Sequence, residues 1–255
     1  RAPYWGYKTD ICIAGDLKGN LERLCEFILT EIEDATQSLV DIELRTKRWL
    51  KDREKSLQQE PEQESPSGLI SAAVLFHVLS EMLPDNTIIV DEIIAQGMLM
   101  MQHLFMNETF TQYRGSAGGL GTGIPTALGI KLAEPSKFVV CFIGDGSFNY
   151  NPIPACMGFS QQYNIPILIV VCNNQGFASQ TWNTRKYFPE GSAVKTASFY
   201  GDVIEPTPDY WKIASAFGGY GERVEKTENL QAALQHGIEA VNGGRLTVID
   251  VILEP

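Results

Sequence analysis

The chain has 255 residues, of which 44% are hydrophobic and 20% are charged, proportions typical of a globular protein with a sizeable core. Its formal net charge of −11 argues against nucleic acid or an anionic membrane as a partner, because both require a basic surface. No apolar run reaches the roughly 18 residues of a membrane span.

The five cysteines are odd in number and form no C-x-x-C pair. Cys141 and Cys172 lie inside apolar runs, where a free thiol behaves as a small buried hydrophobic group. We therefore expect a reducing compartment and a cytoplasmic protein.

The first part of the chain predicts a short strand at 10–16 and an amphipathic helix at 17–34. Residues 42–66 are charged, rich in glutamine and poor in apolar residues. Their first half is typical of a solvated helix, and their end, with Pro61 and Pro66, is typical of a linker. We expect three parts: 1–41 as the end of a preceding domain, 42–66 as a linker, and 67–255 as a domain. The chain is expected to be a piece of a longer polypeptide.

From residue 67 onward, helical and strand patterns alternate. Helices are predicted at 68–83, 123–135, 151–164, 209–220 and 229–244, and strands at 86–92, 137–146, 165–174 and 245–253. Strands that are apolar throughout are typical of a sheet buried on both faces. The alternation predicts an α/β fold with a mostly parallel sheet and helices on both faces.

Three of these strands end in polar residues: Asp91-Glu92, Asp145 and Asn173-Asn174. The second and third strands are consecutive with one helix between them, so a right-handed crossover is expected to make them neighbours. Asp145 would then face Asn174. A carboxylate, an amide oxygen and a backbone carbonyl are hard ligands that suit Mg²⁺ or Ca²⁺.

The sequence around Asp145, "GDGS", also favours phosphate binding. Gly144 and Gly146 allow a sharp turn and a close approach to a ligand, and the Ser147 hydroxyl with the following helix start provides donors. Two simpler interpretations remain open: a plain loop at the glycines, and a turn or helix cap at the asparagines. A G-x-G-x-x-G dinucleotide site is disfavoured because Asn149 stands at the third glycine position.

The combined pattern resembles a known family. "SAGGLGTGIPTALGIKLAEPSKFVVCFIGDGS" followed by "QQYNIPILIVVCNN" is similar to the thiamin-diphosphate motif of the 2-oxo-acid decarboxylase and acetolactate synthase superfamily, benzoylformate decarboxylases in particular. The resemblance covers residues 67–255, the diphosphate-binding domain of such enzymes. Residues 1 to about 40 resemble the end of their central domain.

The resemblance implies a set of site residues. It assigns Mg²⁺ to the Asp145 carboxylate, the Asn174 side-chain oxygen and the Gly176 carbonyl. The residues that it places against thiamin diphosphate are Gly118, Leu120, Gly146, Ser147, Gly176 and Phe177. Among these, Leu120 supports the bent cofactor and the Gly118 carbonyl accepts from its amino group.

The implied activity is decarboxylation of a 2-oxo acid, or carboligation after it, so that the enzyme is a lyase or a transferase. The family glutamate that activates the cofactor lies in a pyrimidine-binding domain outside this chain. That half is expected in cis or from a partner chain, in a homodimer or homotetramer. The alternative is a non-catalytic cofactor-binding or interaction module, and a nicotinamide-linked protein is weaker still. The particular 2-oxo acid stays open.

Three departures from the family pattern bear on cofactor affinity. Ile94 and Ala95 stand where benzoylformate decarboxylases have hydroxyl residues, and Gln96 is a candidate substitute. Phe177 and Ala178 stand where the family often has tyrosine and glycine. An insertion of about two residues is expected at 151–154.

Two further features have competing interpretations. Glu92 is a candidate for acid–base chemistry or for a hydrogen bond that orders a loop, and we favour the second. The stretch after the metal motif, up to about Pro208, is either a lid or a surface loop, with Arg185 as a candidate ligand for a substrate carboxylate.

Overall fold

The structure is a computed structural model, and it describes residues 11, 13–31, 35–57, 68–104, 111–114 and 119–254. The chain divides into two compact units, Arg1–Lys55 and Ser56–Pro255, and each is described by itself. The division falls inside the stretch that we predicted to be a linker.

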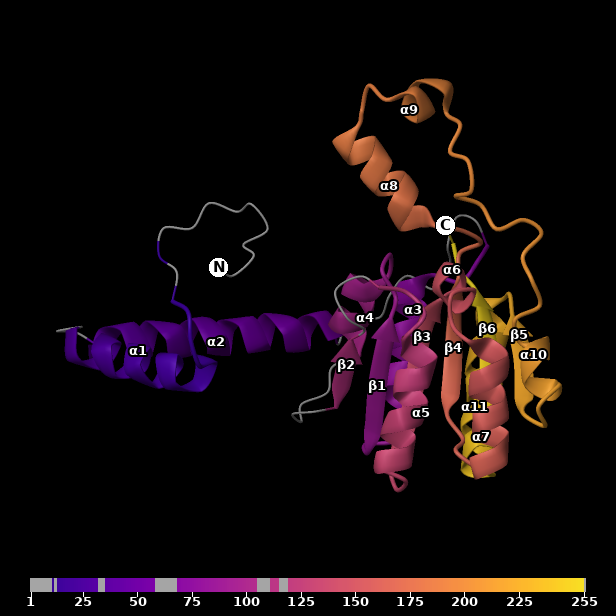
Figure 1. The fold of residues 1–255 in the computed structure, drawn as a ribbon, viewed down its shortest axis with the longest axis horizontal. Helices are drawn as coiled ribbons and strands as arrows, with labels where there is room; N and C mark the ends of the chain where they lie inside the picture. Colours follow the sequence, from indigo (N-terminus) through magenta and orange to yellow (C-terminus); the bar gives the residue numbers. More distant parts are fainter. Residues whose placement is uncertain are drawn as a thin grey trace. The chain divides into compact units, whose positions relative to one another are not determined.

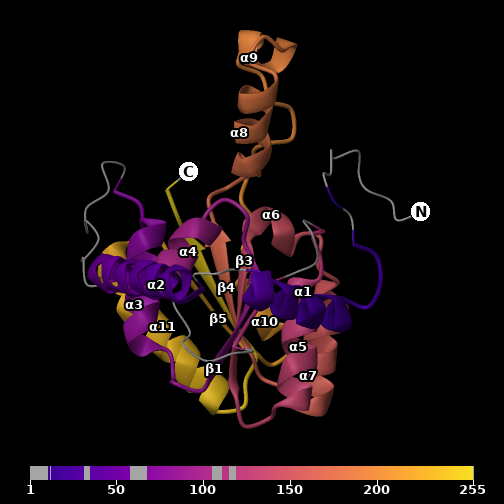
Figure 2. The same cartoon turned by 90° about the vertical axis from the view of Figure 1, so that its left-hand side faces the viewer.

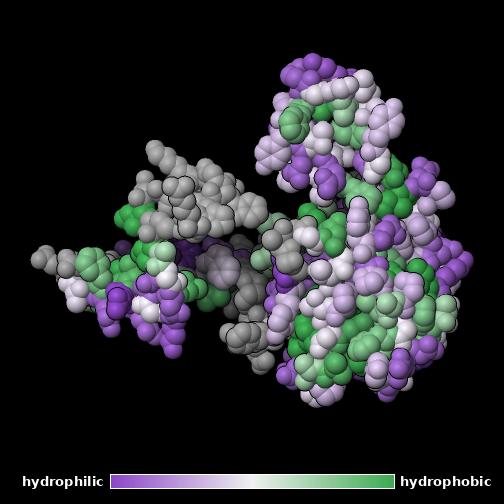
Figure 3. All heavy atoms as spheres, in the orientation of Figure 1, coloured by the Kyte–Doolittle hydropathy of each residue, from purple (hydrophilic) through white to green (hydrophobic). Residues whose placement is uncertain are grey.

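The first unit is helical. Its helices are α1 (Leu17–Glu31), as predicted, and α2 (Ala35–Leu57). α2 includes the helix expected in the first half of 42–66, but it begins at Ala35 and crosses the boundary that we expected between residues 41 and 42. The expected strand at 10–16 is wrong for the residues described there: Ile11 and 13–16 have no strand. Asp16 instead begins α1, because its carboxylate accepts from the Gly19 N–H over 2.7 Å. Apolar side chains such as Phe27 and Trp49 are exposed on this unit, among hydrophilic ones (Figure 3).

The second unit is built on a parallel sheet (Figure 1). Among the described residues the strands are β1 (Thr87–Glu92), β2 (Gln112–Arg114), β3 (Phe138–Gly144), β4 (Leu168–Asn173), β5 (Tyr220–Val224) and β6 (Thr247–Ile252). They lie in the order β2-β1-β3-β4-β6-β5, and every pairing is parallel. The predicted fold class is confirmed.

Helices cover both faces of this sheet (Figure 2). The helices of this unit are α3 (Ala72–Met82), α4 (Gly97–His103), α5 (Gly123–Ala133), α6 (Asp145–Phe148), α7 (Ile153–Tyr163), α8 (Ala178–Tyr187), α9 (Ser192–Thr196), α10 (Lys212–Ser215) and α11 (Thr227–Asn242). Alternate residues of β3 face opposite ways. Val140 and Phe142 pack in the core under α3 and α11, whereas Cys141 and Ile143 pack in the core under α5 and α7.

Residues 209–220 differ from the prediction of one continuous helix. Only Lys212–Ser215 are helical, and β5 begins at Tyr220. Gly218 has a φ of +71°, which ends the helix in the left-handed region that glycine tolerates. The Gly-Gly pair thus turns the chain directly into a strand that the pattern did not reveal.

The strand order places a topological switch between β1 and β3. The chain leaves β1 toward β2 on one side and returns to β3 on the other. In open parallel sheets, ligands bind beyond the carboxyl ends of strands at such a point. A ligand site is therefore expected at the carboxyl ends of β1 and β3. Glu92 is the last residue of β1, and Asp145 directly follows β3.

Candidate functional site

The carboxyl ends of adjacent strands bring the predicted polar residues together. β3 pairs with β4, with Gly144 opposite Cys172, and with β1, with Ile143 opposite Glu92. Asp145 and Asn174 follow β3 and β4 directly and line one narrow cleft. The predicted neighbourhood of these two residues is confirmed.

The Asn174 amide lies between two oxygen atoms. One of its terminal atoms is 3.1 Å from Asp145 Oδ1 and 3.1 Å from the Gly176 carbonyl oxygen. If that atom is nitrogen, it donates to both oxygens. If it is oxygen, three acceptors face one another, and a cation between them would satisfy all three. The donor set of one carboxylate, one amide oxygen and one carbonyl suits Mg²⁺.

The Asp145 carboxylate is buried with little to balance its negative charge. It is 1% exposed, and its Oδ2 atom has no hydrogen-bond partner. Burial raises the pKa of Asp145 to about 6, against the opposing effect of the Gly146 and Gly176 N–H groups. A divalent ion at this carboxylate would supply the missing positive charge. Among the described residues, no group of three or more His, Cys, Asp or Glu side chains could hold a metal.

A glycine is needed at position 146 because the Phe177 ring packs against it, and a sharp turn of the backbone is not the reason. The residues after β3 form the short helix α6, and Gly144 is extended with a φ of −70°. A Cβ atom on Gly146 would lie 2.5 Å from the Phe177 ring. The glycines thus permit close packing of Phe177 over the Asp145 turn, in place of the sharp glycine turn that we expected.

Three cavities meet at this site: a narrow cleft, a cavity of about 390 Å³ that shares Leu120 and Phe177 with the cleft, and a larger one. The narrow cleft, which also contacts Ser147, Leu120 and Phe177, has a volume of about 40 Å³, room for a few water molecules or an ion. The larger adjoining cavity has about 700 Å³ and shares Asn174 and Gly176 with the cleft. A diphosphate held at the cleft would extend into one of the two adjoining cavities. Four residues at which we expected the sequence to depart from the resembled family, or to compensate for a departure, line both the cleft and the cavity of about 700 Å³: Ile94, Ala95, Gln96 and Ala178.

A buried network that sequence reasoning missed supports the end of β4. Asn173 donates to Asp250 Oδ1 over 2.9 Å, and Arg223 donates to Asp250 Oδ2 from Nε over 2.9 Å and from Nη2 over 2.8 Å. Both Asn173 and Asp250 are fully buried. Burial raises the pKa of Asp250, while its hydrogen bonds to Asn173 and Arg223 oppose that rise. A polar residue inside the apolar strand "LTVIDVIL" was the available signal.

The loop carrying Gly176 is held by residues far along the chain. The Phe177 N–H donates to the Asp202 carbonyl over 2.6 Å, and the Ile204 N–H donates to the Gln175 carbonyl over 2.9 Å. Gly176 forms an antiparallel bridge with Val203. These bonds fix the direction of the Gly176 carbonyl relative to Asp145.

Other predicted residues are distributed around the cavities. Leu120 is half-buried and lines the narrow cleft, whereas Gly118 lies outside the described residues. Arg185 lines the larger cavity and stacks on the Phe199 ring, 5.0 Å from its centroid. It lies on α8, which has no buried residue and extends with α9 beyond the carboxyl ends of the strands (Figure 1).

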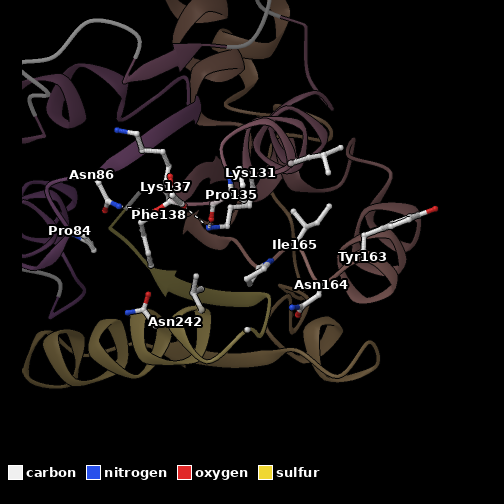
Figure 4. Close-up of a pocket in the computed structure, with 15 residues that line it drawn as sticks. Pro84, Asn86, Lys131, Pro135, Lys137, Phe138, Tyr163, Asn164, Ile165 and Asn242 are labelled. Atoms are coloured by element: carbon white, nitrogen blue, oxygen red, sulfur yellow. Dashed lines mark hydrogen bonds between the residues drawn. The ribbon is translucent and has the colours of Figure 1, made fainter.

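Another cavity, of about 660 Å³, lies at the opposite end of the sheet (Figure 4). Its Lys131 ammonium is already engaged, donating to the Pro135 carbonyl over 2.9 Å and the Lys137 carbonyl over 2.5 Å. Asn86 likewise donates to the Ser136 carbonyl. These polar groups close turns between helices and strands, so this cavity is a weaker candidate than the carboxyl edge.

Comparison with known proteins identifies the family of this chain. The family model described as "Thiamine pyrophosphate enzyme, C-terminal TPP binding domain" matches residues 95–251. A probable acetolactate synthase large subunit from Methanococcus aeolicus is 33% identical over 177 residues, 67% of this chain and 26% of the relative. A benzoylformate decarboxylase from Pseudomonas aeruginosa is 28% identical over 200 residues, 78% of this chain and 36% of the relative. The chain thus spans between a quarter and about a third of these relatives.

Solved structures give the same picture. The thiamine diphosphate-dependent 4-hydroxybenzoylformate decarboxylase of Rhodococcus jostii RHA1 superposes with a TM-score of 0.67 at 26% identity. The match covers 77% of this chain and 35% of that one.

None of the helices among the described residues has the length and apolar content that a membrane crossing requires.

Proposed function

Because this chain belongs to the thiamine pyrophosphate enzymes and contains their C-terminal TPP-binding domain, we propose that it is the diphosphate-binding half of a Mg²⁺-dependent 2-oxo-acid decarboxylase or carboligase. The observation that carries the proposal is the convergence of Asp145, Asn174 and Gly176. One amide atom of Asn174 lies 3.1 Å from oxygens of both other residues, and Asp145 Oδ2 has no partner.

In this proposal each residue has a separate task. Asp145, Asn174 and the Gly176 carbonyl hold Mg²⁺, which binds the cofactor diphosphate. Gly146 and Ser147 line the same cleft and contact the diphosphate. Leu120 and Phe177 border that cleft on its apolar side and limit where the rest of the cofactor lies.

The bound cofactor would supply an electron sink for the charge left when a 2-oxo acid loses CO₂. The residues of this chain bind and orient it and exclude water. The Gly118 carbonyl, outside the described residues, is proposed as the acceptor for its amino group. Arg185, which lines the larger cavity, remains a candidate ligand for the substrate carboxylate.

The proposal includes a pyrimidine-binding half, supplied by another part of the polypeptide or by a second subunit of a homodimer or homotetramer. A cytoplasmic location belongs to the same proposal. It is supported by the free, buried thiols of Cys141, Cys156 and Cys172, since secreted proteins tend to pair their cysteines.

Calorimetric titration tests the metal–diphosphate site. Thiamin diphosphate is titrated into the purified chain with Mg²⁺ and with EDTA. We expect binding that requires Mg²⁺ and weakens by roughly 10–100-fold or more in Asp145→Ala, because the carboxylate proposed to hold the metal is lost. Asp85→Ala, which removes an exposed carboxylate at the other end of β1, is the matched control and should bind normally.

Two results would contradict the proposal. Binding that is equally strong in EDTA would exclude the metal, and equal affinity of Asp145→Ala would place the cofactor elsewhere. Cofactor binding without turnover of any 2-oxo acid, after a pyrimidine-binding half is added, would favour the non-catalytic module.

A further inference from the structure

The carboxylate of Glu92, the last residue of β1, sits against the start of α5. The Gly121 N–H donates to Oε1, the Thr122 N–H donates to Oε1 over 3.2 Å, and the Gly123 N–H donates to Oε2 over 2.8 Å. Glu92 is 6% exposed. Its side chain is therefore a buried anion at the positive end of a helix that lies about 30 residues further along the chain.

Asn151 extends this arrangement to the Asp145 turn. Its Nδ2 donates to Glu92 Oε2 and to the Ser147 carbonyl, both over 2.9 Å, and its Oδ1 accepts from the Ile124 N–H over 3.1 Å. Pro125 has no N–H, so the backbone donors from Gly121 to Pro125 are all satisfied by two side chains. We call Glu92, Asn151 and residues 121–124 the Glu92 clamp.

Two glycines allow the clamp to close. A Cβ on Gly123 would lie 2.5 Å from Glu92 Oε2, and one on Gly121 would lie 2.5 Å from the Tyr150 carbonyl oxygen. Gly121 also has a φ of +96°. The backbone of this loop thus lies directly on Glu92 and on the segment that follows the Asp145 turn.

The clamp determines which helix start is open to phosphate. Because Glu92 already occupies the start of α5, a diphosphate there would meet a negative charge and no free donor. What the clamp leaves facing the cleft is Leu120, the residue directly before Gly121. Its position relative to Asp145 depends on the bonds of Glu92 and Asn151.

We propose that Glu92 and Asn151 are positioning residues that fix Leu120 against the organic part of the cofactor, at a set distance from the metal–diphosphate site. This inference rests on the proposed function, and it assigns to these two residues no contact with the metal or the phosphates. The insertion expected at 151–154 thus begins with a residue that links two parts of the site.

The test is made on the full chain. It compares the affinities for two ligands and also measures amide hydrogen exchange of the backbone. Affinity is measured by calorimetry for thiamin diphosphate and for inorganic pyrophosphate, both with Mg²⁺, and amide hydrogen exchange is measured across residues 119–124. In Glu92→Gln the amide NH₂ group faces backbone donors, so we expect exchange at Gly121–Gly123 to rise roughly tenfold or more. Thiamin diphosphate affinity should fall by roughly tenfold as the Leu120 contact is lost, while pyrophosphate affinity stays unchanged.

Three further variants separate the positioning role of Glu92 from other effects on affinity. Leu120→Ala should show the same loss for thiamin diphosphate with normal exchange. Asn151→Ala, a milder change should Glu92→Gln fold poorly, should raise exchange at Ile124 and lower thiamin diphosphate affinity. Glu222→Gln alters a carboxylate on β5, hydrogen-bonded to the Tyr220 hydroxyl, and should change none of these quantities.

Each contrary result has a distinct meaning. Unchanged exchange in Glu92→Gln, or an equal fall for both ligands, would overturn the positioning role. Failure of the unaltered chain to bind either ligand with Mg²⁺ would instead overturn the proposed function on which the inference rests.

Discussion

Four buried carboxylates lie near the carboxyl ends of the central strands, and their partners differ. Asp250 is paired with Arg223, Glu92 accepts from a helix start, and Asp91 accepts from the Ile93 N–H with Arg114 3.6 Å away. Asp91 and Asp145 each have one oxygen without a hydrogen-bond partner. The charge of Arg114 acts on Asp91, whereas the effects that oppose burial at Asp145 come from backbone N–H groups. Of these two carboxylates, Asp145 is therefore the stronger candidate for a cation.

The buried Asp91 carboxyl group makes the stability of the folded chain depend on pH. Burial is the largest influence on the pKa of Asp91 and raises it above the ordinary value of 3.8, outweighing the Ile93 N–H and Arg114. The folded chain thus binds this proton more tightly than the unfolded chain does. Its contribution to stability is greatest below pH 3.8 and declines as pH rises through the raised pKa.

Asp91→Asn keeps an acceptor for the Ile93 N–H and removes that titration. We expect the variant to be more stable than the unaltered chain at pH 7, by an amount that shrinks as pH falls toward 3.8. Urea unfolding at a series of pH values measures this, with Asp85→Asn as an exposed control that should give no such trend. A variant that is less stable at pH 7 would show that the pairing with Arg114 outweighs burial.

At the scale of elements, the sequence predicts those whose residues share one environment. The strands at 87–92, 138–144, 168–173 and 247–252 are mostly apolar because both faces of the sheet are covered, and each was predicted. β5 was missed because Glu222 and Arg223 interrupt its apolar pattern. Their partners lie on α11 and β6, at sequence distances that a local pattern does not reach.

The same limit applies to the site. Asp145 and Asn174 follow recognisable strands, so their meeting could be inferred from the crossover rule. The bonds between Asn151 and Glu92, 59 positions apart, and between Asp250 and Asn173, 77 positions apart, depend on the final packing of side chains. Sequence reasoning therefore predicted the metal candidates and missed most of the residues that support them.

Arg223 links β5, β6 and the segment before α10. It binds Asp250, Asp209 over 3.0 Å and the Pro208 carbonyl over 2.6 Å. Removing it in Arg223→Ala leaves the fully buried Asp250 without its positive partner, which should lower the free energy of unfolding by about 3–5 kcal/mol.

Chemical denaturation of three variants distinguishes this buried pair from a surface one. Lys212→Ala removes an exposed partner of Asp209 and should change stability by about 1 kcal/mol or less. Arg223→Ala combined with Asp250→Asn should recover part of the loss, because the unpaired charge is gone. No recovery in the double variant would mean that Arg223 acts mainly through Asp209 and Pro208.

At the scale of the whole molecule, the proposed chemistry is contained in one of the two units. The metal candidates, the Glu92 clamp and the Arg223 network all lie within Ser56–Pro255, and the core of that unit is complete on both faces of its sheet. The α1–α2 unit exposes large apolar side chains and contributes none of these residues. The site should therefore not depend on the first 55 residues.

A chain of residues 56–255 is expected to unfold in one cooperative transition and to bind Mg²⁺ with inorganic pyrophosphate as tightly as the full chain. The physical reason is that every described contact of the metal candidates lies inside this unit. Circular dichroism in urea measures the transition, and calorimetry with and without EDTA measures the affinity. A matched chain of residues 68–255, which lacks the end of α2, should behave alike. A folded 56–255 chain that has lost pyrophosphate binding would mean that residues 1–55 take part in the site, and the division of roles between the two units would then be wrong.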